Sequence, residues 1–420
     1  MSGTIAPSRV PPLGAAPPVA SAPPAASRAP AVVRTGYAVI AAAAMIAIGL
    51  TWDIAWHRSV GRDTFWTAPH VVEYLAALLV GASCGGLILR SSFVAGGTGR
   101  EQMVRVWGFR GPFGAWVSVW GSLAMLTSAP FDNWWHNAYG LDVKIVSPPH
   151  ILLLLGMIGI VAGAMLMALA EQNRATDRAA PAPAGQGSRI AGEFAPAFAI
   201  ASGILLLMVA TATFEYTGFP NLWRSRLFYQ ISAALFPLVL AAAARAGRLR
   251  WPATATAAVF MGASLVMSWV LQNVPAAPKL APINNPIEHL VPAPFPVVLV
   301  VPALVFDLLH RWLGDRRDWR LSALLGLGFV LSLLAISWPM STFLLSPAAR
   351  NPVFLADQWD YTARLGPWRY EFWDDLRTGA RALRAGGAAL GKPLAIAVVL
   401  AFVSARLGLW WGGWMRRVRR

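Results

Sequence analysis

Long apolar runs alternate with short polar connections along the chain, and this pattern predicts membrane-spanning helices. Several runs extend for about 20 residues without a charge, the length that crosses the ~30 Å hydrocarbon core as a helix. Because the eighth run is interrupted by Pro292, Pro294 and Pro296, we expect a bent or broken helix there. The fold class is an all-α, polytopic membrane bundle of ten spans, built from outward-pointing helical hairpins. The expected spans are about 35–57, 69–90, 112–136, 149–170, 195–216, 226–245, 252–272, 288–310, 321–345 and 394–414.

The segments around the spans divide the chain into regions. Residues 1–33 are rich in Ala and Pro and cannot bury a core, which predicts a disordered cytoplasmic tail. Four spans within 34–170 form one region, and a cytoplasmic linker is expected at 171–194. The remaining spans occupy 195–414, with an extracytoplasmic loop at about 346–393, and residues 415–420 form a basic cytoplasmic tail.

Composition agrees with this class. Hydrophobic residues make up 56% of the chain and charged residues only 13%, whereas soluble domains carry roughly 25% charged residues. The single cysteine, Cys84, falls inside an apolar span and cannot form an internal disulfide. The glycine pairs at 85–86 and 96–97 lack the lysine or strand context of a nucleotide-binding loop.

The net charge of +16 reflects orientation in a bilayer rather than a nucleic-acid partner. The N-terminal tail, the even-numbered connections and the C-terminus hold 21 Lys and Arg, and the short odd-numbered connections hold 6. The positive-inside rule then places both termini in the cytoplasm. We expect a multi-pass protein of the bacterial inner (plasma) membrane, in contact with the lipid bilayer and with no nucleic acid.

Two copies of one polar pattern carry the candidate chemistry. The first reads Asp-x3-His-x12-His and the second Asp-x3-His-x13-His, and together they use four of the six histidines. Residues four apart share one helix face, and the second histidine of each copy opens the next span. Both sets are therefore expected at the extracytoplasmic ends of spans one to four. Their members are Asp53, His57 and His70, and then Asp132, His136 and His150.

Two imidazoles and one carboxylate form an open ligand set that suits copper, zinc or Fe(II). Asn133 would offer a further oxygen beside the second set, and Glu73 would orient the His70 imidazole from outside the first. The alternative is that these residues, with the neighbouring tryptophans, only mark the membrane interface. Glu288 and His289 are either a third pair of metal ligands or polar residues at the water-exposed end of a span.

The spacing resembles the C subunit of the copper membrane monooxygenases, which include the particulate methane, ammonia and hydrocarbon monooxygenases. The resemblance covers about residues 45–170. It implies copper at Asp53, His57 and His70, and a second copper site at Asp132, His136 and His150. The family's second set opens with Asn where this chain has Asp132, which adds a negative charge. Spans five to ten and the tryptophan-rich loop at 346–393 have no counterpart in that subunit.

This resemblance implies oxidation of a small apolar substrate with dioxygen, by a copper-dependent monooxygenase or one of its subunits, together with other membrane or periplasmic subunits. A metal-ion or small-solute transporter is the main alternative, favoured by the proline-broken eighth span. A non-catalytic membrane subunit of an oxidase complex is another. Haem ligation by His70 and His150 would leave the two aspartates without a role.

Overall fold

The computed structural model describes residues 30–60, 64–94, 103–140, 147–179, 186–277, 288–314, 318–355 and 388–419. Long helices dominate this part of the chain. They are α1 (Pro30–Ser59), α2 (Ala68–Phe93), α3 (Phe113–Tyr139), α4 (Pro148–Ala179), α5 (Gln186–Ala212), α7 (Arg226–Ala246), α8 (Pro252–Leu271), α9 (Val300–Leu313), α10 (Asp318–Leu344) and α12 (Ala388–Met415). The short helix α6 (Phe214–Thr217) and two 3-10 turns, η2 (Pro220–Leu222) and η3 (Pro347–Ala349), join them.

Eight helices in the described residues are long and apolar enough to cross a membrane: α1, α2, α4, α5, α7, α8, α10 and α12. They indicate a multi-pass membrane protein. The other two long elements, α3 and α9, are not among them. At 14 residues α9 is about 21 Å long, less than the ~30 Å hydrocarbon core. Residues 288–299 ahead of α9 are non-helical, which confirms the irregular eighth segment that the prolines predict.

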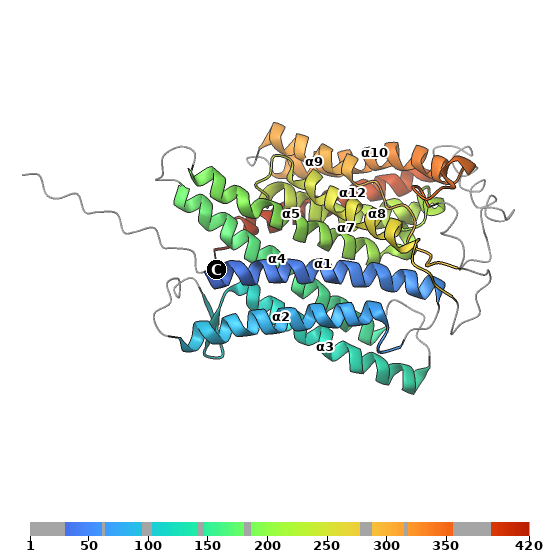
Figure 1. Cartoon of the computed structure of the whole chain (residues 1–420). Helices are drawn as coiled ribbons and strands as arrows, with labels where there is room; N and C mark the ends of the chain where they lie inside the picture. The colour runs from blue at the N-terminus through green and yellow to red at the C-terminus, as the bar shows by residue number, and fades with distance from the viewer. Residues whose placement is uncertain are drawn as a thin grey trace, which may run out of the picture.

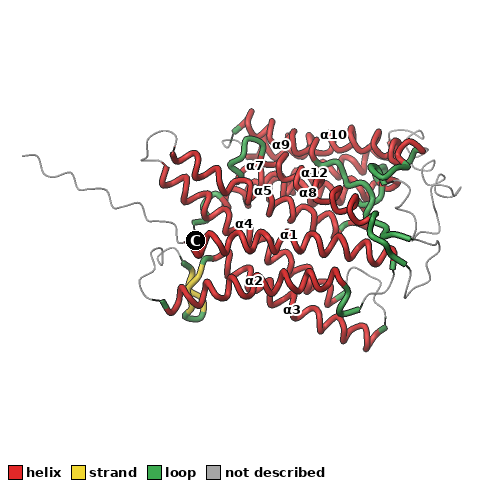
Figure 2. Tube along the Cα trace, viewed as in Figure 1, coloured by secondary structure: helices red, strands yellow, loops and turns green. Residues whose placement is uncertain are grey.

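The helices lie roughly along one direction and form two connected groups (Figure 1). The group α1–α4 packs through α4 and α1 against α5, and α5 leads into the group that contains α7 to α12. We call the end where α1 and α3 finish and α2 and α4 begin the histidine end. The opposite end, where α7 and α12 finish, is the arginine end. Figure 2 shows most of the loop segments of the second group gathered at the histidine end.

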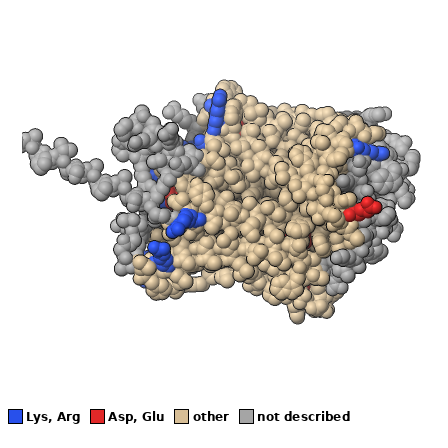
Figure 3. All heavy atoms as spheres, in the orientation of Figure 1, with Lys and Arg blue, Asp and Glu red and all other residues tan. Residues whose placement is uncertain are grey.

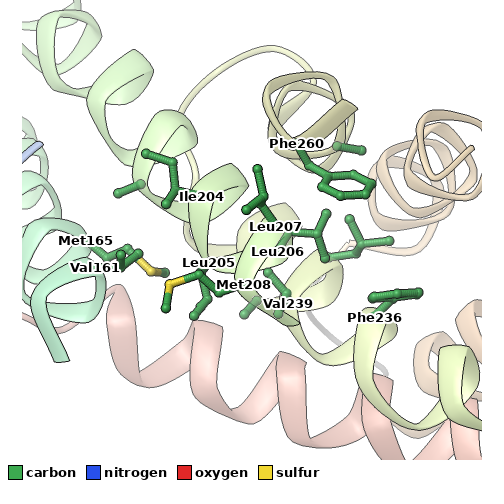
Figure 4. Packing of buried hydrophobic residues seen from close by; sticks show 14 of the residues in the cluster. Val161, Met165, Ile204, Leu205, Leu206, Leu207, Met208, Phe236, Val239 and Phe260 are labelled. Carbon is green, nitrogen blue, oxygen red and sulfur yellow. The ribbon is translucent and has the colours of Figure 1, made fainter. Parts of the chain in front are cut away.

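A continuous apolar core joins the two groups. Figure 4 shows its centre, where side chains of α5 lie between α4, α7 and α8. Val161 and Met165 come from α4, Phe236 from α7 and Phe260 from α8, and all four are buried. Because lipid tails are as apolar as these side chains, close packing between the helices, rather than removal from water, stabilises this contact in a membrane. The core therefore fixes α4, whose first turn carries His150, against the rest of the bundle.

Glycines let α3 and α4 approach backbone to backbone. A Cβ added to Gly121 would lie 2.6 Å from the carbonyl oxygen of Gly156 and 2.6 Å from the backbone nitrogen of Ile160. Gly114 of α3 meets the carbonyl oxygen of Gly163 of α4 in the same way. Small residues spaced along both helices are the usual means of close helix contact in membranes. This contact sets the position of one helix along the other.

At the arginine end, polar side chains of α4 hold the ends of other helices. The buried amide of Gln172 donates to the carbonyl oxygen of Ala246 at the end of α7, at 3.0 Å. Asn173 donates to the carbonyl oxygens of Met415 and Val418, each at 2.9 Å. The expected linker at 171–194 is therefore largely helical, with α4 reaching Ala179 and α5 starting at Gln186. Residues 415–418 of the expected tail lie against α4. The last carbonyls of a helix have no partner within it, and Asn173 supplies a donor to two of them.

A short β-hairpin interrupts the all-helical pattern between α2 and α3. Strands β1 (Val104–Val106) and β2 (Phe109–Gly111) pair antiparallel. Trp107 and Gly108 connect them with φ of 48° and 91°, the positive values that a two-residue type I′ turn requires. The pattern of apolar runs does not predict this hairpin. Of the tail expected at 1–33 and the loop expected at 346–393, residues 1–29 and 356–387 lie outside the described residues. The expectation is wrong for residues 30–33, which begin α1, and for residues 388–393, which begin α12.

Candidate metal sites

The first site is formed where α1 ends and α2 begins. Asp53 and His57 lie in the last two turns of α1, one above the other on the same face. His70 is the third residue of α2 and follows Pro69. A proline in a first turn costs nothing, because its missing N–H would have no helical partner there. The proline therefore helps to start α2 at the point that brings His70 beside α1.

Both imidazoles of the first site face the same carboxylate. His57 Nε2 lies 3.6 Å from Asp53 Oδ2, and His70 Nε2 lies 3.4 Å from Asp53 Oδ1. The His57 side chain is 47% exposed, whereas that of His70 is 17% exposed. The site is thus open on the side of α1 and closed on the side of α2.

A backbone carbonyl sets the orientation of His70. Its Nδ1 lies 3.1 Å from the carbonyl oxygen of Thr64, which only accepts hydrogen bonds, so Nδ1 carries the proton. In the neutral ring, Nε2 then presents a lone pair to Asp53 Oδ1. Two acceptors facing one another are stable only with a cation between them, either a proton or a metal ion. An imidazole that donates Nδ1–H to a carbonyl and offers Nε2 to a metal is the common arrangement of metal-binding histidines.

The second site repeats this geometry between α3 and α4. His136 Nε2 lies 3.3 Å from Asp132 Oδ2, and His150 Nε2 lies 3.4 Å from Asp132 Oδ1. His150 is the third residue of α4 and follows Pro149, as His70 follows Pro69 in α2. One donor atom from each of the three residues lies within 4.8 Å of the others. Among the described residues, this is the one set of three such groups that meets that limit.

One oxygen at the centre of each site fits a bound cation. Asp53 Oδ1 and Asp132 Oδ1 are buried, and neither accepts a hydrogen bond from any described residue. Leaving a buried acceptor without a donor costs about 1–3 kcal/mol, and more when the acceptor is charged. Both atoms point to an imidazole nitrogen that can also act as a ligand. Both sets therefore have the donor types that a transition-metal ion requires, and the second set also meets the distance limit given above, which the first set does not.

The auxiliary residues lie in different surroundings. Glu73 is buried between α2 and α1, where a Cβ on Gly49 would lie 3.3 Å from its Oε1. The Nδ1 hydrogen bond of His70 goes to Thr64, so a role for Glu73 in orienting that ring stays a prediction. Asn133 is exposed on α3, next to Asp132 in sequence, and its role as a ligand also stays a prediction.

The third polar pair lies near the first site. His289 and Glu288 are exposed and belong to an extended segment that pairs with residues 274–276. This segment contacts the end of α1, since the Val291 N–H donates to Ser59 Oγ at 2.6 Å and Arg58 donates to the carbonyl oxygen of Pro292. The position brings Glu288 and His289 to the histidine end without making them part of either site.

Thr64 and Tyr74 are two further residues beside the first site that the spacing of Asp and His does not predict. Thr64 acts through its backbone carbonyl, which leaves no mark in the pattern of side chains. The hydroxyl of Tyr74 donates to the carbonyl oxygen of Phe65 at 3.1 Å. A usable signal was present in Thr67-Ala68-Pro69, a helix start that predicts a tight turn just ahead of His70.

No protein-family model matches this chain, and no curated protein or solved structure matches it either. The resemblance to the copper monooxygenase C subunit therefore rests on the spacing of six residues, and function must be argued from the two sites.

Proposed function

We propose that this chain is a copper-binding membrane protein with two Asp/His/His sites on the extracytoplasmic side of the bacterial plasma membrane. The observation that carries the proposal is the repetition of one geometry. In each helix pair a single aspartate faces two imidazole Nε2 atoms at 3.3–3.6 Å. Zinc or iron would suit the same donors, but imidazoles with a carboxylate favour copper among divalent ions.

Within this proposal the chain oxidises a small apolar substrate with dioxygen, alone or as one subunit of an oxidase complex. Bound copper would supply the one-electron chemistry that activates dioxygen. The aspartate and the two histidines of each set would hold the copper ion. The aspartate would neutralise part of the charge of the ion, and the helix ends would leave one side of the site open. At the second site the end of α3 adds apolar surface, since Trp135 packs against Tyr139 with ring centres 4.6 Å apart.

The proposed orientation has both termini in the cytoplasm and ten crossings, with α3 and the segment 288–313 added to the eight apolar helices. The charge distribution supports it. On the face in Figure 3, most of the blue Lys and Arg spheres lie towards the end where α1 begins, away from both sites. Arg174, Arg245 and Arg416 are also at that end, and the guanidinium of each donates to a backbone carbonyl of another segment there.

Metal analysis of the purified protein tests the proposal. We expect two copper ions per chain in the wild type, and one in each of the variants His57→Ala and His136→Ala. His310→Ala is the matched control, because His310 lies on α9 at the arginine end, and it should keep both ions. Circular dichroism would confirm equal helix content. If all four proteins held the same amount of copper, these residues would not be ligands.

A transport function is the second candidate, and the non-helical segment 288–299 favours it. Most of its residues are buried. Two of its carbonyls accept hydrogen bonds from the side chains of Arg58 and Ser268, whereas carbonyls in a helix accept them from backbone N–H groups. Irregular backbone at membrane depth often lines a solute path. Uptake of radioactive copper into proteoliposomes tests this candidate. Uptake equal to that of empty vesicles would remove it.

A further inference from the structure

The turn between α1 and α2 is built around one carbonyl oxygen. Thr64 O accepts hydrogen bonds from the Thr67 N–H at 3.1 Å, from Thr67 Oγ1 at 2.7 Å and from His70 Nδ1 at 3.1 Å. The direction of the His70 ring therefore depends on where the backbone of this turn lies.

Tyr74 holds the same turn from the next helical position. It lies four residues after His70, so the two side chains are neighbours on one face of α2. Its hydroxyl donates to the carbonyl oxygen of Phe65 at 3.1 Å, and its ring packs against the Phe65 ring with centres 5.3 Å apart. The ring centres of His70 and Tyr74 are 6.1 Å apart. Tyr74 thus contacts both the turn and the imidazole that the turn orients.

We propose that Tyr74 is a positioning residue for the first site. By fixing the Phe65 carbonyl it fixes the adjacent Thr64 carbonyl, which keeps the proton of His70 on Nδ1 and turns Nε2 towards Asp53. The role rests on the proposed metal function of that site. The backbone carbonyl of Phe65 accepts a hydrogen bond from the Tyr74 hydroxyl, but it cannot take up the proton. Tyr74 therefore acts by geometry and not as an acid.

Two hydroxyls secure the turn, and each can be removed alone. Tyr74→Phe keeps the ring and loses the bond to Phe65, and Thr67→Val loses the side-chain bond to Thr64. Thr67→Ser keeps that hydroxyl and should restore wild-type behaviour. Tyr37→Phe is the matched control, because Tyr37 is half-exposed near the start of α1, far along the helix from His57.

The experiment isolates the first site in a chain that carries His136→Ala and His150→Ala. In this background we expect Tyr74→Phe and Thr67→Val to raise the Kd for copper(II) by about tenfold or more, the order seen when an outer partner of a metal ligand is lost. Nitrogen couplings in the electron paramagnetic resonance spectrum should change as well. Tyr37→Phe and Thr67→Ser should leave both readouts unchanged.

A metal-free measurement separates this proposal from the proposed function. Nitrogen-15 spectra of labelled histidine, with His70 identified by its loss in His70→Ala, should show the Nδ1–H form in the wild type and a mixture in Tyr74→Phe. Unchanged His70 signals and an unchanged Kd in Tyr74→Phe would overturn the positioning role. Failure of the isolated first site to bind copper, with the histidine spectra shifted as expected, would instead overturn the metal function and leave Tyr74 as a determinant of ring orientation.

Discussion

At the scale of single residues, one carboxylate is shared by two imidazoles in each site. Asp132 places one oxygen on His136 and the other on His150. Its Oδ1 is buried without a hydrogen-bond donor among the described residues, and a proton on the facing imidazole or a bound metal ion would satisfy it. An asparagine, which the monooxygenase C subunits have at the matching position, would offer an oxygen without the charge.

Replacing Asp132 with Asn tests the value of that charge. The side chain keeps its shape, so we expect the site to survive with a Kd for copper(II) higher by at least about tenfold, while the first site stays unchanged. A competition titration against a chelator of known affinity measures both. Asn133→Asp, which adds a charge on the exposed neighbour, is the control and should change the second site much less. Equal affinity in Asp132→Asn and wild type would show that the carboxylate charge does not hold the metal.

At the scale of elements, the second site depends on how α3 meets α4. The site residues lie at the ends of these helices, and the glycine contacts lie more than one turn away along their lengths. Because Gly121 touches backbone atoms of α4, there is no flexible side chain to move aside. A change there shifts a whole helix, and with it the distance between Asp132 and His150.

Gly121→Ala should therefore weaken copper binding at the second site, although residue 121 does not contact that site. The added methyl group would force the helices apart and cost about 1–3 kcal/mol, the usual penalty of overpacking. We expect a lower Tm in detergent and loss of copper from the second site before the first. Gly85→Ala is the control, because a Cβ at Gly85 meets nothing within 4 Å, and alanine favours the helix by up to about 1 kcal/mol. If the two variants had the same Tm and copper content, helix contact at Gly121 would not govern the site.

At the scale of the whole molecule, the bundle has two chemically different ends. Both aspartate–histidine sets lie at one end, and the ion pair of Arg245 with Asp318, at 2.6 Å and 3.0 Å, lies at the other. The same Asp318 is 3.5 Å from Arg406 of α12, so one carboxylate joins α7, α10 and α12. Such an asymmetry is what an oriented membrane protein shows.

The orientation can be measured with a pair of exposed tryptophans at opposite ends. Trp66, 74% exposed, lies beside the first site, and Trp107, 78% exposed, lies in the turn of the β-hairpin. In a Cys84→Ala background, Trp66→Cys should react with a membrane-impermeant maleimide in spheroplasts, and Trp107→Cys should react only after permeabilisation. The reverse result would place the two Asp/His/His sets in the cytoplasm.

Much of each site could be predicted from sequence, because the spacing of Asp53 and His57 is local and follows the period of a helix. The closing histidines were also predictable, since a short connection returns the chain beside itself. The support around them was not. The bond from His70 to Thr64 uses a backbone atom, and the bonds of Asn173 reach residues 242 and 245 positions away. Periodicity carries no information about such partners.

The buried amides near the end of α4 can form their hydrogen bonds only after later helices have been synthesised. Gln172 finds its acceptor 74 positions later in α7, and Asn173 finds its acceptors only when the end of α12 has been made. Until then water at the membrane surface must satisfy both amides, because their transfer into an apolar environment without partners is unfavourable. The helices that carry both Asp/His/His sets can therefore be made before these hydrogen bonds of α4 form.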